Sequence, residues 1–93
     1  MAITTRITNG NVDLTKTARY VLQVTVSESG GTNVVEVDIK DGSSGGNTIA
    51  SIRCPAGQSA PPYVFPKPGL KCASGVFIFK AGTGTLNGSI ITS

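Results

Sequence analysis

Residues 34–55 read VVEVDIKDGSSGGNTIASIRCP, and this stretch decides the fold of the chain. Every second residue from Val35 to Ile39 is apolar and the residues between them are charged, which predicts a strand with one buried face. After the Gly-Ser-rich run at 41–47, residues 50–54 alternate in the same way until Pro55 ends the pattern. We therefore predict two antiparallel strands whose register is strongly specified, because a shift by one residue would bury the charges.

Other segments of the chain carry strand patterns as well. Residues 18–26 are apolar at even positions, with Val21 as the exception, and the loop 27–33 leads back to Val34, so we predict a hairpin over 18–40. Further strands are predicted at 3–7, at 76–79 and, after a hairpin turn at 81–84, at 86–92, where Gly88 indicates a bend or bulge.

The whole chain is predicted to be one domain over residues 1–93. No segment shows the apolar spacing of an amphipathic helix, and glycines interrupt every candidate. Turn residues recur at intervals of roughly ten residues, which is typical of a small β-sandwich or a jelly-roll-like barrel of about seven antiparallel strands. The predicted fold class is therefore all-β.

Two segments, Val76–Phe79 and Tyr63–Phe65, present more apolar surface than a single buried face needs. Val76–Phe79 is apolar without a break, which predicts a strand covered on both faces, the second by a neighbouring copy. All five prolines lie within the edge arm at 55–70, so Tyr63–Phe65 must form an edge strand or an extended arm. That arm either folds over the end of the sandwich or contacts a neighbouring subunit. Residues 1–10 form an N-terminal strand or arm.

Charge and hydropathy limit the partners that we expect. The chain has 93 residues and a formal net charge of +3, and its eight Lys and Arg residues are scattered along the sequence. A scattered excess of positive charge does not make a nucleic-acid footprint. The N-terminus MAITTRITNG lacks the apolar run of a signal peptide, and no segment approaches the ~20 apolar residues of a membrane span. We expect cytosolic synthesis, no nucleic acid and no membrane partner.

The chain has no histidine, and this bears on catalysis. The usual nucleophile triads need histidine as their base. Glu36 and Asp38 share one predicted face, but a solvated strand face is the expected place for charges without any catalytic role. We therefore expect a protein that is not an enzyme, that holds no metal and that needs no cofactor. A calcium site at Asp38 and Asp41 is weighed against a mobile hairpin tip, which we favour because the spacing of a calcium-binding hand is missing.

The two cysteines, Cys54 and Cys72, have two possible states. They form one disulfide if their strands are neighbours, or they remain reduced and pack as small hydrophobic side chains. Cytosolic synthesis favours the reduced thiols. Without histidine, two cysteines cannot complete the usual ligand set of a zinc site.

The order of the glycine- and proline-containing turns along the chain resembles that of a known class of proteins. The residues that carry the resemblance are Asp41-Gly42, Ile52 to Gly57, Phe65-Pro66, Pro68-Gly69, Ser74 to Ile78 and Gly82-Thr83-Gly84. In this order they resemble small β-sandwich virion proteins of tailed bacteriophages, over roughly residues 18–92. The resemblance implies a structural role in many copies, often as trimers, that decorate or cement a capsid or form part of the neck or tail. It carries no catalytic residues.

From these observations we expect a capsid decoration or cement protein. It would be a homo-oligomer, preferably a trimer, that binds neighbouring major capsid protein subunits on the capsid exterior after assembly in the host cytoplasm. The predicted interface residues are Ile3, Ile7, Tyr63, Val64, Phe65, Val76 and Ile78. The alternatives are a neck or tail component, and a ligand- or glycan-binding β module that uses Tyr63 and the loop 41–47.

Overall fold

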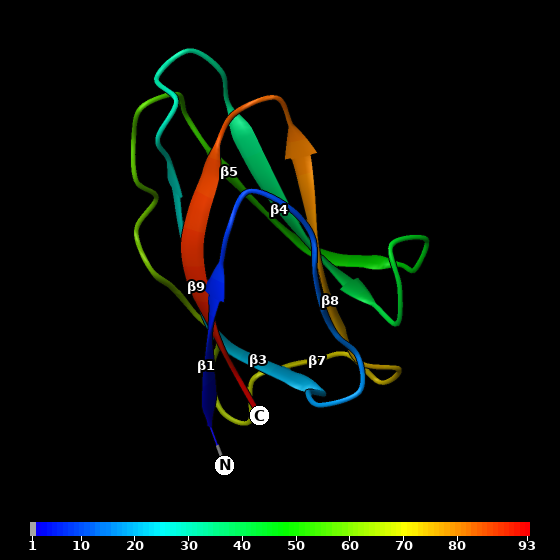
Figure 1. Ribbon diagram of the computed structural model, residues 1–93. Coiled ribbons are helices and arrows are strands. Elements are labelled where there is room, and N and C mark those ends of the chain that lie inside the picture. The colour runs from blue at the N-terminus through cyan, green and yellow to red at the C-terminus, as the bar shows by residue number, and fades with distance from the viewer. Residues whose placement is uncertain (1) are drawn as a thin grey trace.

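The computed structural model describes residues 2–93, which form two antiparallel sheets packed face to face (Figure 1). Met1, the first residue of the predicted N-terminal arm, lies outside the described residues. The strands are β1 (Ile3–Ile7), β2 (Val12–Leu14), β3 (Tyr20–Glu28), β4 (Val35–Asp41), β5 (Thr48–Cys54), β6 (Tyr63–Val64), β7 (Leu70–Lys71), β8 (Val76–Gly82) and β9 (Leu86–Thr92). Sheet A has the order β1-β9-β3-β6, with β7 also paired to β3, and sheet B has the order β2-β8-β4-β5.

The predicted all-β sandwich is confirmed, with nine strands in the described residues in place of about seven. The additional strands are short. The sequence pattern does not predict β2 or β7, because runs of three and two residues are too short to show a period-two alternation. Tyr63–Val64 forms the edge strand β6, one of the two forms predicted for this arm.

The pairing of β4 with β5 follows the prediction. Val35 lies opposite Cys54 and Val37 lies opposite Ile52, and all four side chains are buried in the core. The charged residues of β4 project from the other face, as the alternation requires. The ladder is irregular only near the hairpin loop, where the register shifts after Ile39.

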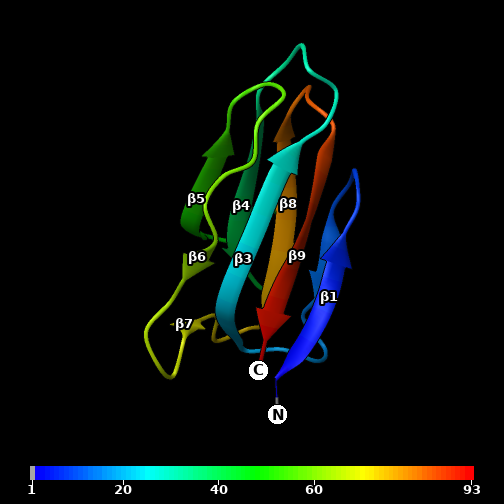
Figure 2. The same cartoon turned by 90° about the vertical axis from the view of Figure 1, so that its left-hand side faces the viewer.

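Two predicted hairpins are wrong. β3 and β4 do not pair, because β3 lies in sheet A beside β9 while β4 lies in sheet B beside β5 and β8. The turn at 81–84 likewise connects β8 of sheet B to β9 of sheet A. Figure 2 shows both connections crossing from one layer to the other at the same end of the sandwich. Alternation identifies the residues that face the core, but the two sheets share one core, so it cannot assign a strand to a sheet.

The core face of β3 changes phase along the strand. The register against β9 shifts between Val21 and Gln23, which places one extra residue, Leu22, in the ladder. Val21 is therefore fully buried, while Tyr20 and Leu22, predicted to face the core, are only half-buried. A one-residue bulge moves the side chains that precede it to the opposite face of the strand. Val21, the exception to the alternating pattern of residues 18–26, therefore marks the position of the bulge.

Strand β8 is apolar on both faces, as predicted. Val76 and Ile78 are fully buried in the core between the sheets. Phe77 and Phe79 are half-buried on the outer face of sheet B, and the Lys40 ammonium lies 5.3 Å from the centre of the Phe79 ring. This cation–π contact covers part of the second apolar face.

Gly88 serves close strand packing and does not form the predicted bend or bulge. It pairs in regular register with Ile7 of β1 and with Val26 of β3. A Cβ atom at this position would overlap the carbonyl oxygen of Thr25. Glycine is therefore needed here because the backbones of β9 and β3 approach one another too closely for a side chain.

The buried carboxylate of Glu28, at the end of β3, ties three loops together. It accepts hydrogen bonds from the backbone N–H groups of Gly30 at 2.8 Å, Gly31 at 2.7 Å, Gly57 at 2.9 Å and Thr85 at 2.6 Å. The bonds to Gly57 and Gly31 do most to lower the pKa of Glu28, from its ordinary value of 4.5 to about 2. The loops after β3, β5 and β8 are thus held by one ionised side chain.

We expect Glu28→Gln to lower the thermal midpoint by roughly 5–10 °C at neutral pH, because an amide cannot accept four backbone N–H bonds. The folded-state pKa is depressed, so the stabilisation by Glu28 is complete above pH 4.5 and is lost as the pH falls towards 2. Circular dichroism melts between pH 7 and pH 2 measure both effects. Glu36→Gln is the matched control and should not lower the thermal midpoint at neutral pH, because it removes a carboxylate whose ionised form Asp38 disfavours. Equal acid sensitivity of the wild type and Glu28→Gln would contradict this role.

Gly88→Ala should destabilise the fold by about 1–3 kcal/mol, since the added methyl group forces β9 away from β3. Urea unfolding followed by circular dichroism gives this value. Gly10→Ala is the control, because a Cβ at Gly10 meets no atom within 4 Å. An unchanged urea midpoint for Gly88→Ala would show that the two strands are not so closely packed.

Candidate functional site

The structure divides the predicted interface residues into two groups. Ile3, Tyr63 and Val64 are exposed, with 48%, 52% and 64% of their surface accessible, and Phe65 is half-buried against the core. The side chains of the other three, Ile7, Val76 and Ile78, are fully buried and pack between the two sheets, so they offer no side-chain surface to a partner. Ile7 nevertheless lies on the edge strand β1, where the predicted contact by strand pairing would use the backbone.

Five strands form the two lateral sides of the sandwich (Figure 2). One side consists of β1 from sheet A and β2 from sheet B, and we call it the β1/β2 side. The opposite side consists of β5 from sheet B with β6 and β7 from sheet A, and we call it the β5/β6 side. Each of these strands has a row of backbone N–H and C=O groups that faces away from its own sheet.

Prolines limit what the edge at β6 can do. Pro61 and Pro62 precede the strand, and Pro66 and Pro68 follow it. Because proline has no N–H, this edge offers few donors to a further strand. The Tyr63 and Phe65 rings lie beside one another, with centroids 5.1 Å apart and planes inclined at 45°, so the edge presents an aromatic surface instead.

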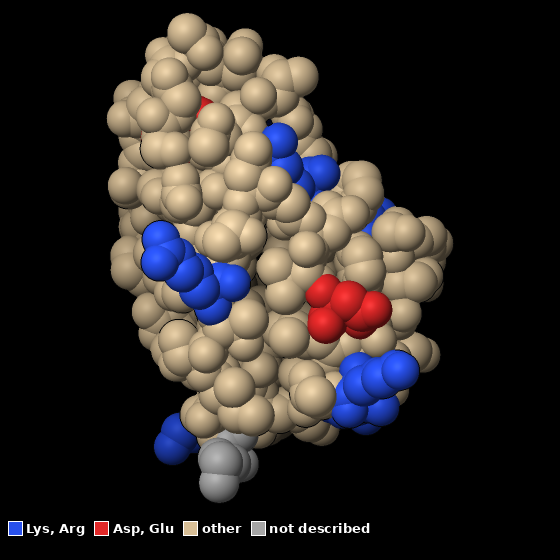
Figure 3. All heavy atoms as spheres, in the orientation of Figure 1, with Lys and Arg blue, Asp and Glu red and all other residues tan. Residues whose placement is uncertain are grey.

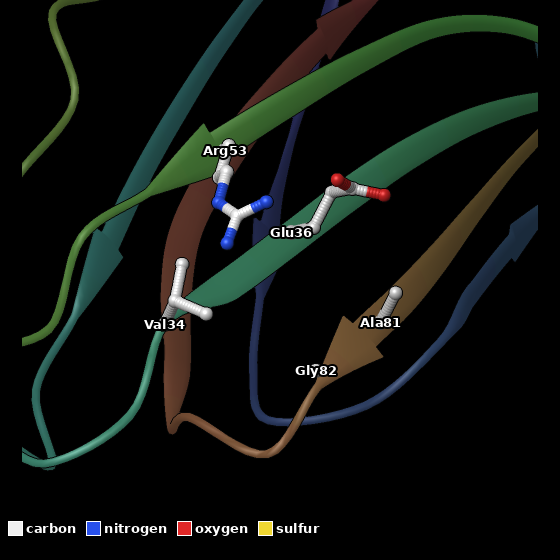
Figure 4. Close-up of a pocket in the computed structure, with 5 residues that line it drawn as sticks. All are labelled: Val34, Glu36, Arg53, Ala81 and Gly82. Carbon is white, nitrogen blue, oxygen red and sulfur yellow. The ribbon is translucent and has the colours of Figure 1, made fainter.

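A groove runs between β5 and the proline segment on the β5/β6 side. It has a volume of about 390 Å³ and is lined by Ser51, Ile52, Arg53, Ala60, Pro61, Pro62 and Tyr63. Arg53 also borders a second hollow of about 240 Å³, with Val34, Glu36, Ala81 and Gly82 (Figure 4). The Arg53 guanidinium therefore stands between two concave surfaces.

The outer face of sheet B carries the carboxyl groups that the sequence placed together. Glu36 and Asp38 share this face, and the Ser51 hydroxyl donates to Asp38 Oδ1 at 2.8 Å. A hydrogen bond to Asp38, together with charge repulsion and some burial, raises the pKa of Glu36, while Arg53 opposes the shift. The pair is a local acidic feature of this face, in contact with the Ser51 hydroxyl.

The proposed calcium ligands are both used in the fold. Asp38 accepts the Ser51 hydroxyl, and Asp41 Oδ1 accepts the backbone N–H of Ser74 at 2.7 Å. Within residues 2–93, the structure places no three Cys, Asp or Glu side chains in an arrangement that could hold a metal ion. The geometry therefore gives the calcium hypothesis no support.

Both cysteines are free thiols that are fully buried. Cys54 lies at the end of β5 in sheet B, whereas Cys72 follows β7, which pairs with β3 in sheet A. The Cys54 Sγ lies 2.9 Å from the carbonyl oxygen of Gln58, and burial, more than the nearby Asp41, raises the pKa of Cys72 to about 11. The two thiols pack as small hydrophobic groups, which is the state that the sequence favoured.

Positive and negative side chains are mixed over the face shown in Figure 3, and they do not form a continuous basic stripe there. In the part of the chain that the structure describes, no helix has the length and apolar character needed to cross a membrane.

The sequence pattern places Glu28 in a polar loop and does not predict its role in joining loops. The available signal was the sequence Ser-Glu-Ser-Gly-Gly, in which a carboxylate precedes glycine N–H groups that no side chain shields. The partners Gly57 and Thr85 are distant in the sequence, so only the fold shows that the carboxylate joins three loops.

No family model and no curated protein sequence matches the chain. A solved structure from work described as "Bacillus endospore appendages form a novel family of disulfide-linked pili" has a similar fold, with a TM-score of 0.61. The likeness covers 100% of this chain and 85% of the other, at 13% sequence identity. The chain therefore shares its β-sandwich fold with a protein of bacterial spore appendages.

Proposed function

We propose that this protein is a structural subunit that assembles with copies of itself through its two lateral sides. The observation that carries the proposal is the position of the exposed large apolar residues. The four in the described chain are Ile3 on β1, Ile49 on β5, and Tyr63 and Val64 on β6. All of them lie on edge strands, where apolar side chains beside unpaired backbone groups favour association with another chain.

The two lateral sides differ, and this determines the type of assembly. A contact between the β1/β2 side of one copy and the β5/β6 side of the next is heterologous. Repetition of such a contact gives a ring when the rotation closes and a filament when it does not. Ile3 of one copy would then approach Tyr63 and Val64 of the next.

The fold likeness to a pilus protein supports the filament as the first form of this assembly. The second form is a closed trimer on the exterior of a capsid, where it would bind the major capsid protein. The resemblance of residues 18–92 to small β-sandwich virion proteins of tailed bacteriophages implies this form. In a phage, the filament form would correspond to a neck or tail component. Both forms use the same lateral contact, and they differ in whether its repetition closes into a ring or continues as a filament.

A ligand-binding module is the competing function, and the exposed Tyr63 beside the proline-lined groove is the observation that favours it. Sugar rings stack on exposed aromatic side chains of this kind. A glycan array with the purified protein separates the two proposals, since a subunit with a purely structural role should give no specific signal.

We expect Val64→Asp to weaken self-association at least about tenfold, because a charge would be buried in the contact without a partner. Light scattering after size-exclusion chromatography across a concentration series, with negative-stain microscopy of the product, measures the effect. Ser44→Asp, in the exposed β4–β5 loop, is the control. Phe65 and residues 1–8 are poorer targets, because Phe65 and Ile7 contribute to the core.

A wild-type protein that stays monomeric at millimolar concentration would refute the proposed function. Normal assembly of Val64→Asp would refute only the assignment of the contact to the β5/β6 side.

A further inference from the structure

The alternation of hydrogen bonds across sheet B determines which backbone groups face its outer edge. The backbone N–H of Lys80 on β8 donates to Asn11 Oδ1, on the side that faces away from β4. In an antiparallel sheet the N–H and C=O of one residue point to the same side, and opposite residues alternate between hydrogen-bonded and non-hydrogen-bonded pairs. Val37, which lies opposite Lys80, therefore directs its backbone groups to β5, where they pair with Ile52.

The residues on either side of Ile52 consequently direct their backbone groups away from β4. Within residues 2–93, β5 is the last strand of sheet B, so the N–H and C=O groups of Ser51 and Arg53 have no strand beside them. These two residues also line the groove of about 390 Å³ on the β5/β6 side. The groove thus offers two donors and two acceptors at the spacing with which an extended chain binds to a sheet edge.

The inner surface of the groove is apolar and partly aromatic. Tyr63 lies opposite Val24, a core residue of β3, so the Tyr63 side chain lies on the side of sheet A that faces sheet B. Tyr63 is nevertheless 52% exposed, and Ile52 and Ala60 line the groove beside it. An apolar side chain that entered the groove would contact all three residues.

One positive charge stands at the border of the groove. Arg53 is exposed and lies opposite Glu36 on β4, but Figure 4 shows the Glu36 carboxyl group turned away from the Arg53 guanidinium. A carboxylate beyond the edge of β5 could therefore bind the guanidinium from its other side. Asp38 lies opposite Ser51 and would repel an acid placed next to Ser51. A bound chain is thus expected to carry its acid beside Arg53.

We propose that the groove binds an extended peptide of another protein, which adds to β5 as an antiparallel strand. The peptide residue opposite Arg53 is Asp or Glu, because it meets the guanidinium. Its next residue lies opposite Ile52 and is apolar, because its side chain enters the groove. The third residue lies opposite Ser51 and is uncharged. The recognised sequence therefore reads acid, apolar, uncharged from the amino to the carboxyl end.

The inference goes beyond the proposed function, because the occupant is a different chain. An open assembly through the two lateral sides leaves one β5/β6 side free at its end, so the terminal copy can still bind the peptide. The partner would anchor or cap the assembly there. This position at the end of an assembly rests on the proposed function, whereas binding of the peptide to a single copy does not.

The probe is a synthetic peptide of threonines with glutamate and valine at its centre, in that order, and with both ends blocked. We expect it to bind dilute protein with a dissociation constant below about 1 mM and to shift the amide signals of Ser51 and Arg53 in an NMR titration. The same peptide with lysine in place of glutamate should bind at least about tenfold more weakly, because lysine repels Arg53.

Variants of the protein test the two walls of the groove. Arg53→Gln should raise the dissociation constant at least about fivefold and abolish the preference for glutamate over lysine. Tyr63→Ala should raise it about fivefold by removing apolar contact. Arg6→Gln, which removes an exposed charge on β1 of the opposite side, is the matched control and should bind as the wild type does. Circular dichroism verifies that each variant folds.

Unchanged Ser51 and Arg53 signals at millimolar peptide would overturn the inference, and so would equal affinity for the glutamate and lysine peptides. A glycan that binds through Arg53 and Tyr63 while the peptide does not would assign the groove to a sugar and also overturn it. These outcomes leave the proposed function standing, because light scattering measures self-association separately. A monomeric wild type that binds the peptide would refute the proposed function alone.

Discussion

The carboxylate of Glu28 is the interaction on which one end of the sandwich depends. Four backbone N–H groups from three loops converge on it, and all three loops, at 29–34, 55–62 and 83–85, carry the chain from one sheet to the other. Crossing loops are rich in glycine and leave backbone groups without ladder partners. A single buried anion satisfies them together, which explains why the pKa of Glu28 lies near 2.

The small size of the core determines which apolar side chains remain exposed. The core consists of aliphatic side chains and two thiols between sheets of four and five strands. In a chain of 93 residues such a core leaves several apolar groups without cover, and they lie on the edge strands and on the outer side of β8. The exposed large apolar side chains of the described residues thus lie along the edge strands, while Phe77 and Phe79 are half-buried on the outer face of sheet B.

The lateral sides have different chemical characters. Prolines around β6 leave an aromatic and aliphatic edge, and the longer β5 keeps its backbone groups open beside Arg53. The β5 edge therefore offers backbone hydrogen-bonding groups, and the β6 edge offers apolar surface. Both thiols are buried in the core, so neither lateral side presents a cysteine side chain.

The sequence alone determined the all-β class, the β4–β5 pair with its register, and the direction in which most side chains point. The alternation of apolar and polar residues shows which side chains face the core and which face outward, because successive side chains of a strand point to opposite faces. Tertiary structure alone decided which sheet each strand joins, so the hairpins predicted at 18–40 and 81–84 became crossings between layers. The tertiary structure also decided that Ile7, Val76 and Ile78 belong to the core, because both sheets pack over the same core. It placed Asp13 on β2 and Arg53 on β5, at opposite edges of sheet B, because only the pairing of the strands determines which of them lie at the edges.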